Sequence, residues 1–243
     1  MRRPRICFYV SDFGYGHAAR AIALTRELQD ALSAEVTIRT GSPAEFMARS
    51  LPGVEVRRGQ NDPGVVMEGT AVEGEKTRAA VERWVASWDD YIATERSFLQ
   101  DHQIDLVLSD IAPQPFLAAE ELGIPSFGIS NFTWHLIYTH LFGKTEETDR
   151  IAEAYRAADG ALLLPLHEPM EVFSNRREVG LVARRVTRDR EALRGLPRAR
   201  PLVYLRPPEP AVIRGCTCLV PSWTEIPGTV SIPPDETETQ DWI

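Results

Sequence analysis

Short apolar runs alternate with helix-like stretches along most of this 243-residue chain. A short run rich in apolar and β-branched side chains indicates a strand buried in a parallel sheet, and apolar residues three or four positions apart indicate a helix packed against it. The pattern predicts strands at residues 5–10, 35–40, 54–57, 105–109, 125–130 and 160–165. It predicts helices at residues 17–32, 43–49, 76–101, 113–122, 131–142 and 145–158. This order favours an α/β fold with helices on both faces of a parallel sheet.

The pattern weakens in two places. Residues 59–75 are polar and rich in glycine, which predicts a surface loop. Beyond residue 165 the sequence predicts a strand at 178–186, a polar helix at 187–196 and a further strand at 200–205.

The last part of the chain differs in composition. Residues 206–243 contain many prolines, which leave little room for helices or central strands and predict an irregular tail. We therefore expect a Rossmann-like domain over 1–186, a linker and the start of a truncated second domain over 187–205, and a Pro/Thr/Glu-rich tail over 206–243.

Composition and charge exclude several classes of protein. The formal net charge of −8 disfavours a nucleic-acid or anionic-membrane surface, because those partners attract basic patches. No run approaches the roughly 18 apolar residues of a membrane span, and the N-terminus lacks the pattern of a signal peptide. Cys7 is expected to be buried, while Cys216 and Cys218 lack the second pair that a zinc site needs. We expect a cytoplasmic protein without metal or cofactor, and its assembly into a homo-oligomer is left open.

A glycine-rich turn follows the first predicted strand. It contains Gly14 and Gly16, and His17 comes next, in the first turn of the predicted helix. In a parallel sheet the loops after the strands form the ligand crevice, and glycines let the backbone approach a ligand. A helix N-terminus offers free N–H groups and disfavours a protonated ring, so His17 would be able to accept a proton from a hydroxyl.

Two other interpretations of this turn remain. A tight strand-to-helix connection also uses glycines, with His17 as a capping or packing residue. The pattern Gly14-x-Gly16-x-x-Ala19 also fits the dinucleotide fingerprint. That fingerprint expects an acidic residue at the end of the second strand, where this chain has Arg39, which would face the 2′-phosphate of NADP.

Two longer segments resemble a known family. The runs SDFGYGHAARAIALTREL and DLVLSDIAPQPFLAAEELGIPSFGISNFTWHLIY resemble the N-terminal half of GT-B glycosyltransferases. They look closest to the glycosyltransferase-like domain that is also fused to plant arabinose kinases. The likeness extends from about Arg5 to about Leu205. In that superfamily two Rossmann-like domains face each other, the first mainly binding the acceptor and the second binding the nucleotide-sugar donor.

The resemblance implies roles for particular residues. Many members place a histidine after the first strand as the base that deprotonates the acceptor hydroxyl, and His17 matches that position. In some members an aspartate after the fourth or fifth strand orients this histidine; Asp110 is the candidate, with helix capping or turn formation as its alternative role. Phe132 is expected to pack in the core more than Trp134. Substrate contacts are expected from Gly14, Tyr15, Gly16, Arg20, Asn131 and Trp134.

The chain departs from the family after Leu205. The glycine-rich and acidic motifs that would hold a nucleotide diphosphate are absent, so we expect the donor domain to be missing, through truncation or a shifted reading frame. Without it the isolated chain would lack donor positioning and leaving-group stabilisation and would be inactive.

Three hypotheses follow. The chain is the acceptor-binding half of a glycosyltransferase that obtains its nucleotide-sugar donor through a partner chain, or a non-catalytic sugar-binding or nucleotide-sugar-binding module. The third hypothesis is a protein of another class on the same fold, such as an NADP-binding Rossmann protein.

Overall fold

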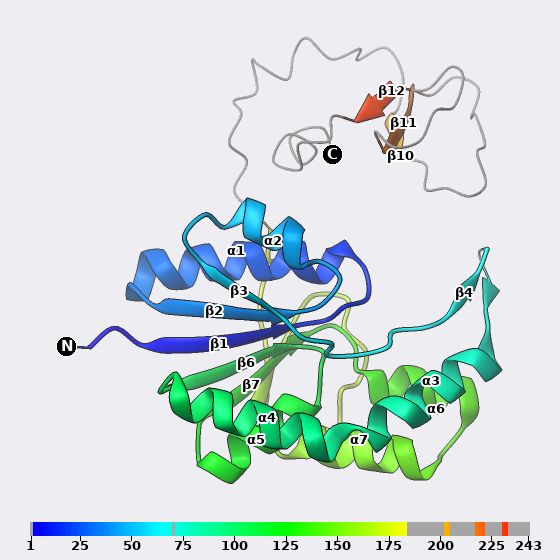
Figure 1. Cartoon of the computed structure of the whole chain (residues 1–243). Coiled ribbons are helices and arrows are strands. Elements are labelled where there is room, and N and C mark those ends of the chain that lie inside the picture. Colours follow the sequence, from blue (N-terminus) through cyan, green and yellow to red (C-terminus); the bar gives the residue numbers. More distant parts are fainter. Residues whose placement is uncertain (1, 70, 184–201, 205–216, 222–229, 233–243) are drawn as a thin grey trace. The chain divides into compact units, whose positions relative to one another are not determined.

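A computed structural model describes residues 2–69, 71–183, 202–204, 217–221 and 230–232 of the chain (Figure 1). The chain divides into two compact units, residues 1–184 and 185–243, which are described separately. The predicted division of the second unit into a linker and a tail stays a prediction.

The first unit is built on a seven-stranded parallel sheet with the order β3-β2-β1-β6-β7-β8-β9. Its strands are β1 (Arg5–Val10), β2 (Glu35–Thr40), β3 (Glu55–Arg58), β6 (Leu106–Asp110), β7 (Ser126–Ser130), β8 (Gly160–Leu163) and β9 (Arg176–Glu178). A short antiparallel pair, β4 (Met67–Glu68) and β5 (Ala71–Val72), lies outside this sheet. The chain adds strands on one side of β1 and then on the other, so the strand order reverses between β1 and β6. Ligand crevices of open parallel sheets form at such a reversal.

Helices cover both faces of the sheet, as Figure 1 shows. One face carries α1 (Tyr15–Leu32) and α2 (Ala44–Ser50). The other carries α3 (Gly74–Ala86), α4 (Trp88–Asp101), α5 (Gln114–Leu122), α6 (Trp134–Phe142) and α7 (Glu146–Arg156). β1 is buried from Ile6 onward because both of its faces are covered, which explains its continuous apolar run. The predicted α/β fold with a Rossmann-like parallel sheet is confirmed, and none of the described helices is long and apolar enough to cross a membrane.

The predicted helix over 76–101 is two helices. α3 ends at Ala86 and α4 begins at Trp88, with Ser87 between them. Ser87 Oγ donates to Trp84 O at 2.7 Å, and such a bond offers the backbone an alternative to continued helix. The apolar spacing continues across the break because both helices pack against the same side of the sheet.

Two further predictions needed correction. The strand predicted over 178–186 lies instead at β9, an edge strand whose side chains are exposed, so its position leaves no apolar pattern. The loop over 59–75 is not confined to the surface, because Asn61 and Asp62 are almost completely buried. The Asn61 amide donates to Val10 O and Arg39 O, which satisfies a polar side chain inside the domain.

The second unit contains a three-stranded parallel sheet with the order β10-β11-β12. β10 (Leu202–Tyr204) confirms the strand predicted near residue 200, while β11 (Thr217–Pro221) and β12 (Val230–Ile232) lie in the segment predicted to be irregular throughout. Both strands contain β-branched residues, and Pro221 stands at the last position of β11. The helix predicted at 187–196 falls outside the described residues.

Candidate functional site

The candidate site lies where β1 and β6 end side by side. The turn after β1 enters α1 through Gly14, whose φ of +82° favours glycine. Gly16 has an ordinary φ and open space around its α-carbon, so the backbone requirement rests on Gly14 alone. Tyr15 is exposed, and its ring contacts the ring of Phe46 at 5.2 Å.

His17 and Asp110, which are buried, form one polar group with the partly buried Arg20. His17 Nδ1 lies 2.8 Å from Asp110 Oδ1. Arg20 donates from Nε to Asp110 Oδ2 at 2.8 Å and from Nη2 to Oδ1 at 2.6 Å, and Arg20 Nη2 is also 3.1 Å from His17 Nδ1. A proton on Nδ1 that donates to Asp110 leaves the other ring nitrogen, Nε2, with the lone pair that a base needs.

The charge on Asp110 is stabilised by its two basic neighbours. Asp110 is fully buried, and burial by itself raises the pKa of a carboxyl group. The positive charges of His17 and Arg20 more than offset burial and lower the pKa of Asp110 below its ordinary value. Arg20, predicted to contact substrate, therefore has its guanidinium bound to Asp110.

The aromatic residues after β7 lie in a different arrangement from the predicted one. Trp134 is 1% exposed and stacks on Tyr138, with ring centroids 5.2 Å apart. Phe132 is partly exposed, and its ring meets the His17 ring edge to face at 5.7 Å. Asn131 is also partly exposed, and its carbonyl oxygen accepts from Glu168 N at 2.9 Å. Phe132, rather than Trp134, is thus the aromatic side chain after β7 that contacts the His17 ring.

The residue after Asp110 has strained backbone geometry. Ile111 has a φ of +74°, which a β-branched residue rarely adopts and which costs about 1–3 kcal/mol. Tyr155 Oη donates to Ile111 O and accepts from Trp134 N at 3.0 Å, so one buried hydroxyl joins the turns after β6 and β7. Strain held by surrounding bonds is common at functional sites.

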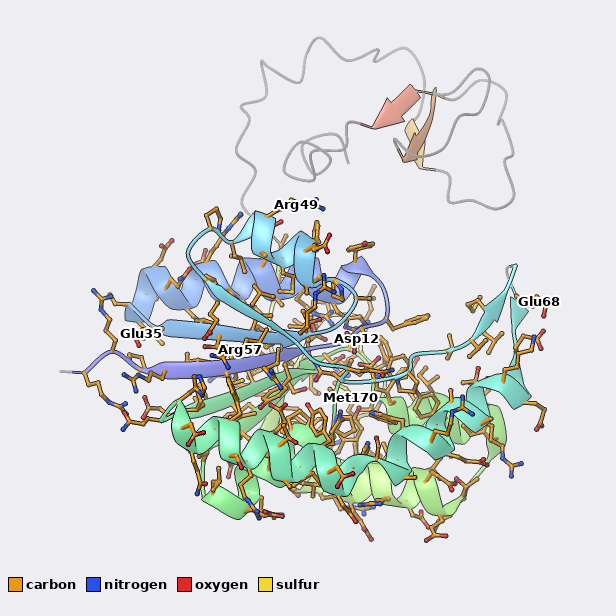
Figure 2. All side chains as sticks on the ribbon, in the orientation of Figure 1. Asp12, Glu35, Arg49, Arg57, Glu68 and Met170 are labelled. Carbon is orange, nitrogen blue, oxygen red and sulfur yellow. The ribbon has the colours of Figure 1, made fainter. Side chains whose placement is uncertain are left out.

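Asp12 ties three loops together at this edge of the sheet. Its carboxylate accepts from the backbone N–H groups of Gly41, Ser42, Asn61 and Asp62. Figure 2 shows Asp12 at the end of the sheet opposite Glu35, where the loops after the strands gather. Burial raises the pKa of Asp12 although these four bonds lower it. A side chain on Gly41 would meet Asp12 Oδ1 at 2.5 Å, so this approach needs a glycine.

Asp62 is a second buried carboxylate at the site. Ser11 Oγ donates to Asp62 Oδ1 at 3.2 Å. The Trp134 indole is a second donor near this carboxylate, although no hydrogen bond of ordinary geometry reaches Oδ2 among the described residues. The pKa of Asp62 is raised to about 7, first by burial and then by the charge of Asp12, while the Ser11 hydroxyl, His17 and the Trp134 indole lower it.

The sequence did not single out Asp62, because a polar loop without periodicity predicts an exposed side chain. The sequence holds one weak indication of its burial: three polar residues, Gln60, Asn61 and Asp62, come soon after the end of a predicted strand.

Arg39 does not have the setting that the NADP interpretation needs. Its guanidinium forms a buried ion pair with Glu95 and lies over the Phe98 ring at 4.8 Å from the centroid. A 2′-phosphate would have to displace Glu95. In the part of the chain that the structure describes, no three His, Cys, Asp or Glu side chains gather in a metal-binding group. Cys7 is fully buried as predicted.

Comparison with known proteins gives one similar sequence and many similar folds. No family model matches the chain. L-arabinokinase of Arabidopsis thaliana is 29% identical over 197 residues, which cover 77% of this chain and 19% of that protein. The chain therefore spans about a fifth of the length of this curated relative.

The similar solved structures include three plant proteins. UGT89C1 of Arabidopsis thaliana, complexed with UDP-L-rhamnose, aligns with a TM-score of 0.57 and 11% identity over 90% of this chain and 65% of its own. UGT2 of Phytolacca americana, complexed with UDP-2fluoro-glucose and pterostilbene, aligns with a TM-score of 0.52 and 15% identity over 90% and 68%. A UDP-glucosyltransferase from Polygonum tinctorium aligns with a TM-score of 0.51 and 15% identity over 84% and 60%. At these identities the likeness shows a shared fold.

Proposed function

Since the chain carries a GT-B glycosyltransferase-like domain, as its two sequence motifs indicated, we propose that it is the acceptor-binding half of a glycosyltransferase. Its task is to hold a hydroxyl-bearing acceptor against His17. Donor binding is assigned to a separate domain, which in this proposal can be supplied by a partner chain. The similarity to L-arabinokinase supports a sugar or another polyhydroxyl compound as the acceptor.

One observation carries the proposal: an imidazole bound to a buried aspartate at the reversal of strand order. The His17 Nδ1–Asp110 Oδ1 contact of 2.8 Å fixes the ring and leaves Nε2 to accept a proton. When the acceptor oxygen attacks the anomeric carbon of the donor, its proton passes to His17 Nε2 and the nucleoside diphosphate leaves. Phe132 packs against the same ring and limits its movement.

The direct test compares two histidine variants. His17→Ala should lower transfer from UDP-sugars to a panel of hydroxyl acceptors by about 10²–10⁴-fold while the melting temperature stays near that of wild type. His140→Ala, an exposed histidine on α6, is the matched control and should retain full activity. The assay uses the full chain with and without a separately expressed donor domain. Equal activity of both variants would contradict the assignment of His17 as the base.

A non-catalytic binding module is the second candidate. The observation in its favour is the double hydrogen bond from Arg20 to Asp110, which already neutralises the carboxylate that would assist His17. A module of this kind would bind sugars or nucleotide sugars, seen as a rise in melting temperature, without transfer under any condition. Thermal shift with NADP in parallel tests the dinucleotide interpretation.

A further inference from the structure

The hydroxyl of Tyr155 bonds to the turns after two neighbouring strands at the site. Tyr155 lies on α7 and is fully buried. Its Oη donates to Ile111 O, in the turn after β6, and accepts at 3.0 Å from Trp134 N, which follows β7. A phenol has one proton to donate and an oxygen that accepts, so a single hydroxyl makes both bonds. Both turns lie beside residues that contact the His17 ring.

The first of these bonds supports the position of Asp110. Asp110 ends β6, where it pairs with Val10, and its Oδ1 lies 2.8 Å from His17 Nδ1. The next residue, Ile111, has a φ of +74°, a strained value for a β-branched side chain. Rotation about φ at Ile111 moves the peptide group that joins it to Asp110. The sheet therefore holds Asp110 from one side, and the bond from Tyr155 to Ile111 O holds it from the other.

The second bond supports the position of Phe132. Trp134 begins α6, and the first N–H groups of a helix have no partner inside it. The Tyr155 hydroxyl accepts from Trp134 N and so fixes the backbone where this helix starts. The Trp134 ring meets the Phe132 ring edge to face at 5.8 Å, and the Phe132 ring meets the His17 ring at 5.7 Å. A movement of Trp134 would therefore reach the imidazole through one intervening ring.

Packing alone does not explain the hydroxyl. The centroid of the Tyr155 ring lies 6.3 Å from that of the Phe116 ring and 5.2 Å from that of the Phe173 ring. A phenylalanine would keep both contacts, because they involve only the ring. The hydroxyl adds a shared partner for two turns. One of these turns follows the acid that binds His17, and the other follows the aromatic residue that packs on its ring.

We propose that Tyr155 is a positioning residue for His17: its hydroxyl holds Asp110 and Phe132 in contact with the imidazole and thereby keeps the ring proton on Nδ1. The role rests on the proposed function, in which the acceptor hydroxyl loses its proton to His17 Nε2. Tyr155 is buried and exchanges no proton in that step. The orientation of the ring exists without substrate, so it is measurable whether or not the chain transfers sugars.

The experiment locates the ring proton of His17 by ¹⁵N NMR of the full chain, at a pH where the ¹⁵N shifts show a neutral ring. In wild type the proton should be on Nδ1, where Asp110 accepts it. Tyr155→Phe should raise severalfold the share of molecules that carry the proton on Nε2, because Asp110 and Phe132 are then held less firmly.

Tyr138→Phe is the matched control. It removes another fully buried hydroxyl, which donates at 2.9 Å to Gly64 O in the loop after β3. Gly64 is adjacent to neither contact of His17, so this variant should leave the ring proton on Nδ1. Equal shares of the two tautomers in Tyr155→Phe and Tyr138→Phe would overturn the proposal.

If Tyr155→Phe does not fold, the same measurement is made in an Ile111→Gly background. Glycine adopts a φ of +74° without strain, so the turn no longer needs the hydroxyl to form. The bond to Trp134 N is still lost when Tyr155→Phe is added. The added substitution should again move the ring proton toward Nε2, and a share equal to that of Ile111→Gly alone would overturn the proposal.

Kinetics separate this role from the proposed function. Tyr155→Phe should lower kcat for transfer about 10–100-fold and leave KM near the wild-type value, since the base is misplaced while the acceptor is still bound. A rise in KM with kcat unchanged would overturn the positioning role. A moved ring proton in a chain that transfers no sugar under any condition would support the positioning of His17 and refute its assignment as the base.

Discussion

Two buried ionic clusters, one on each face of the seven-stranded sheet, differ in how their side chains are hydrogen-bonded. In the Glu95 cluster, formed by Tyr9, Arg39 and Glu95, the carboxylate accepts from Arg39 Nε at 3.1 Å, from Arg39 Nη2 and from Tyr9 Oη at 2.8 Å. Both of its oxygens are paired. Such a group stabilises the fold through full hydrogen bonding and offers nothing to a ligand.

The edge cluster, formed by His17, Arg20 and Asp110, is paired in a different way. Both oxygens of Asp110 accept hydrogen bonds, but the ring of His17 is held through one nitrogen, Nδ1. Both clusters join a buried carboxylate to an arginine, so the ion pair itself does not distinguish them. The edge cluster differs in that it also holds an imidazole through one nitrogen.

The largest effect is expected from breaking the Glu95 cluster. Glu95→Ala leaves the Arg39 charge and the Tyr9 hydroxyl buried without a partner, which should lower the free energy of unfolding by about 3–5 kcal/mol in urea denaturation. The matched control is Glu121→Ala, because Glu121 pairs with Arg96 at 2.9 Å on the surface, and its loss should cost about 0–1 kcal/mol. If Glu95→Ala lowers the free energy of unfolding no more than the control does, the Glu95 cluster does not stabilise the fold.

Asp62, the buried carboxylate that accepts from Ser11 at the end of β1, should respond with the opposite sign. The folded-state pKa of Asp62, about 7, lies above the unfolded value of 3.8, so the folded protein binds more protons between these values and loses stability as pH rises through them. Above pH 7 the buried charge costs about 4 kcal/mol. Asp62→Asn removes this cost.

Urea denaturation of wild type and Asp62→Asn at pH 4 and pH 8 measures the difference. The free energy of unfolding of the variant relative to wild type should increase by about 4 kcal/mol from the lower to the higher pH. A difference that does not depend on pH would mean that Asp62 is ionised throughout and is stabilised as fully as Glu95.

A smaller effect is expected at the hydroxyl that supports the strained turn. Tyr155→Phe leaves Ile111 O and Trp134 N without their shared partner and should lower the free energy of unfolding by about 1–3 kcal/mol. The control, Tyr15→Phe, removes a hydroxyl from an exposed ring and should change stability by less than about 0.5 kcal/mol. Thermal denaturation of both variants checks this, and a neutral Tyr155→Phe would show that the turn needs no support.

The smallest effects separate the two glycines of the turn. Gly14→Ala places a side chain at a φ of +82° and should cost about 1–2 kcal/mol. Gly16→Ala lies within α1, with open space around the added methyl group, and should stabilise the protein by about 0.5–1 kcal/mol. Opposite signs in thermal denaturation would confirm that only Gly14 has a backbone role, and equal signs would contradict it.

The fold was largely predictable because apolar periodicity survives wherever an element has a buried face. β1 and α1 fall within two residues of their predicted bounds. The predictions of secondary structure fail where the apolar pattern of the sequence does not follow the burial or the end of an element. β9 is exposed and has no apolar pattern, and the pattern runs unbroken through Ser87, where a local hydroxyl bond ends the helix.

The candidate site was predictable in part. The turn chemistry pointed to His17, and the resemblance pointed to Asp110, which the structure brings into contact. The ion pair between Arg20 and Asp110 was not predictable. The spacing of Arg20 and His17 places both on one side of α1, but it does not show which acidic residue of a neighbouring strand lies beside them. The burial of Asp62 was missed because a polar residue in a loop without periodicity is expected in solvent. Phe132 contacts His17 where Trp134 was expected at the site, because the spacing of residues does not give the direction of their side chains.

The pairing of β1 with β6 has a consequence for how the protein folds. His17 lies on α1, directly after β1, and Asp110 ends β6, 93 positions further along the chain. Strands β1 to β3 form one side of the sheet and β6 to β9 form the other. The contact between His17 and Asp110 therefore forms only after β1 has paired with β6. Joining distant segments is slow relative to local structure formation. The imidazole–carboxylate contact is therefore a reporter of completed folding, because a chain arrested before β1 and β6 pair would lack it.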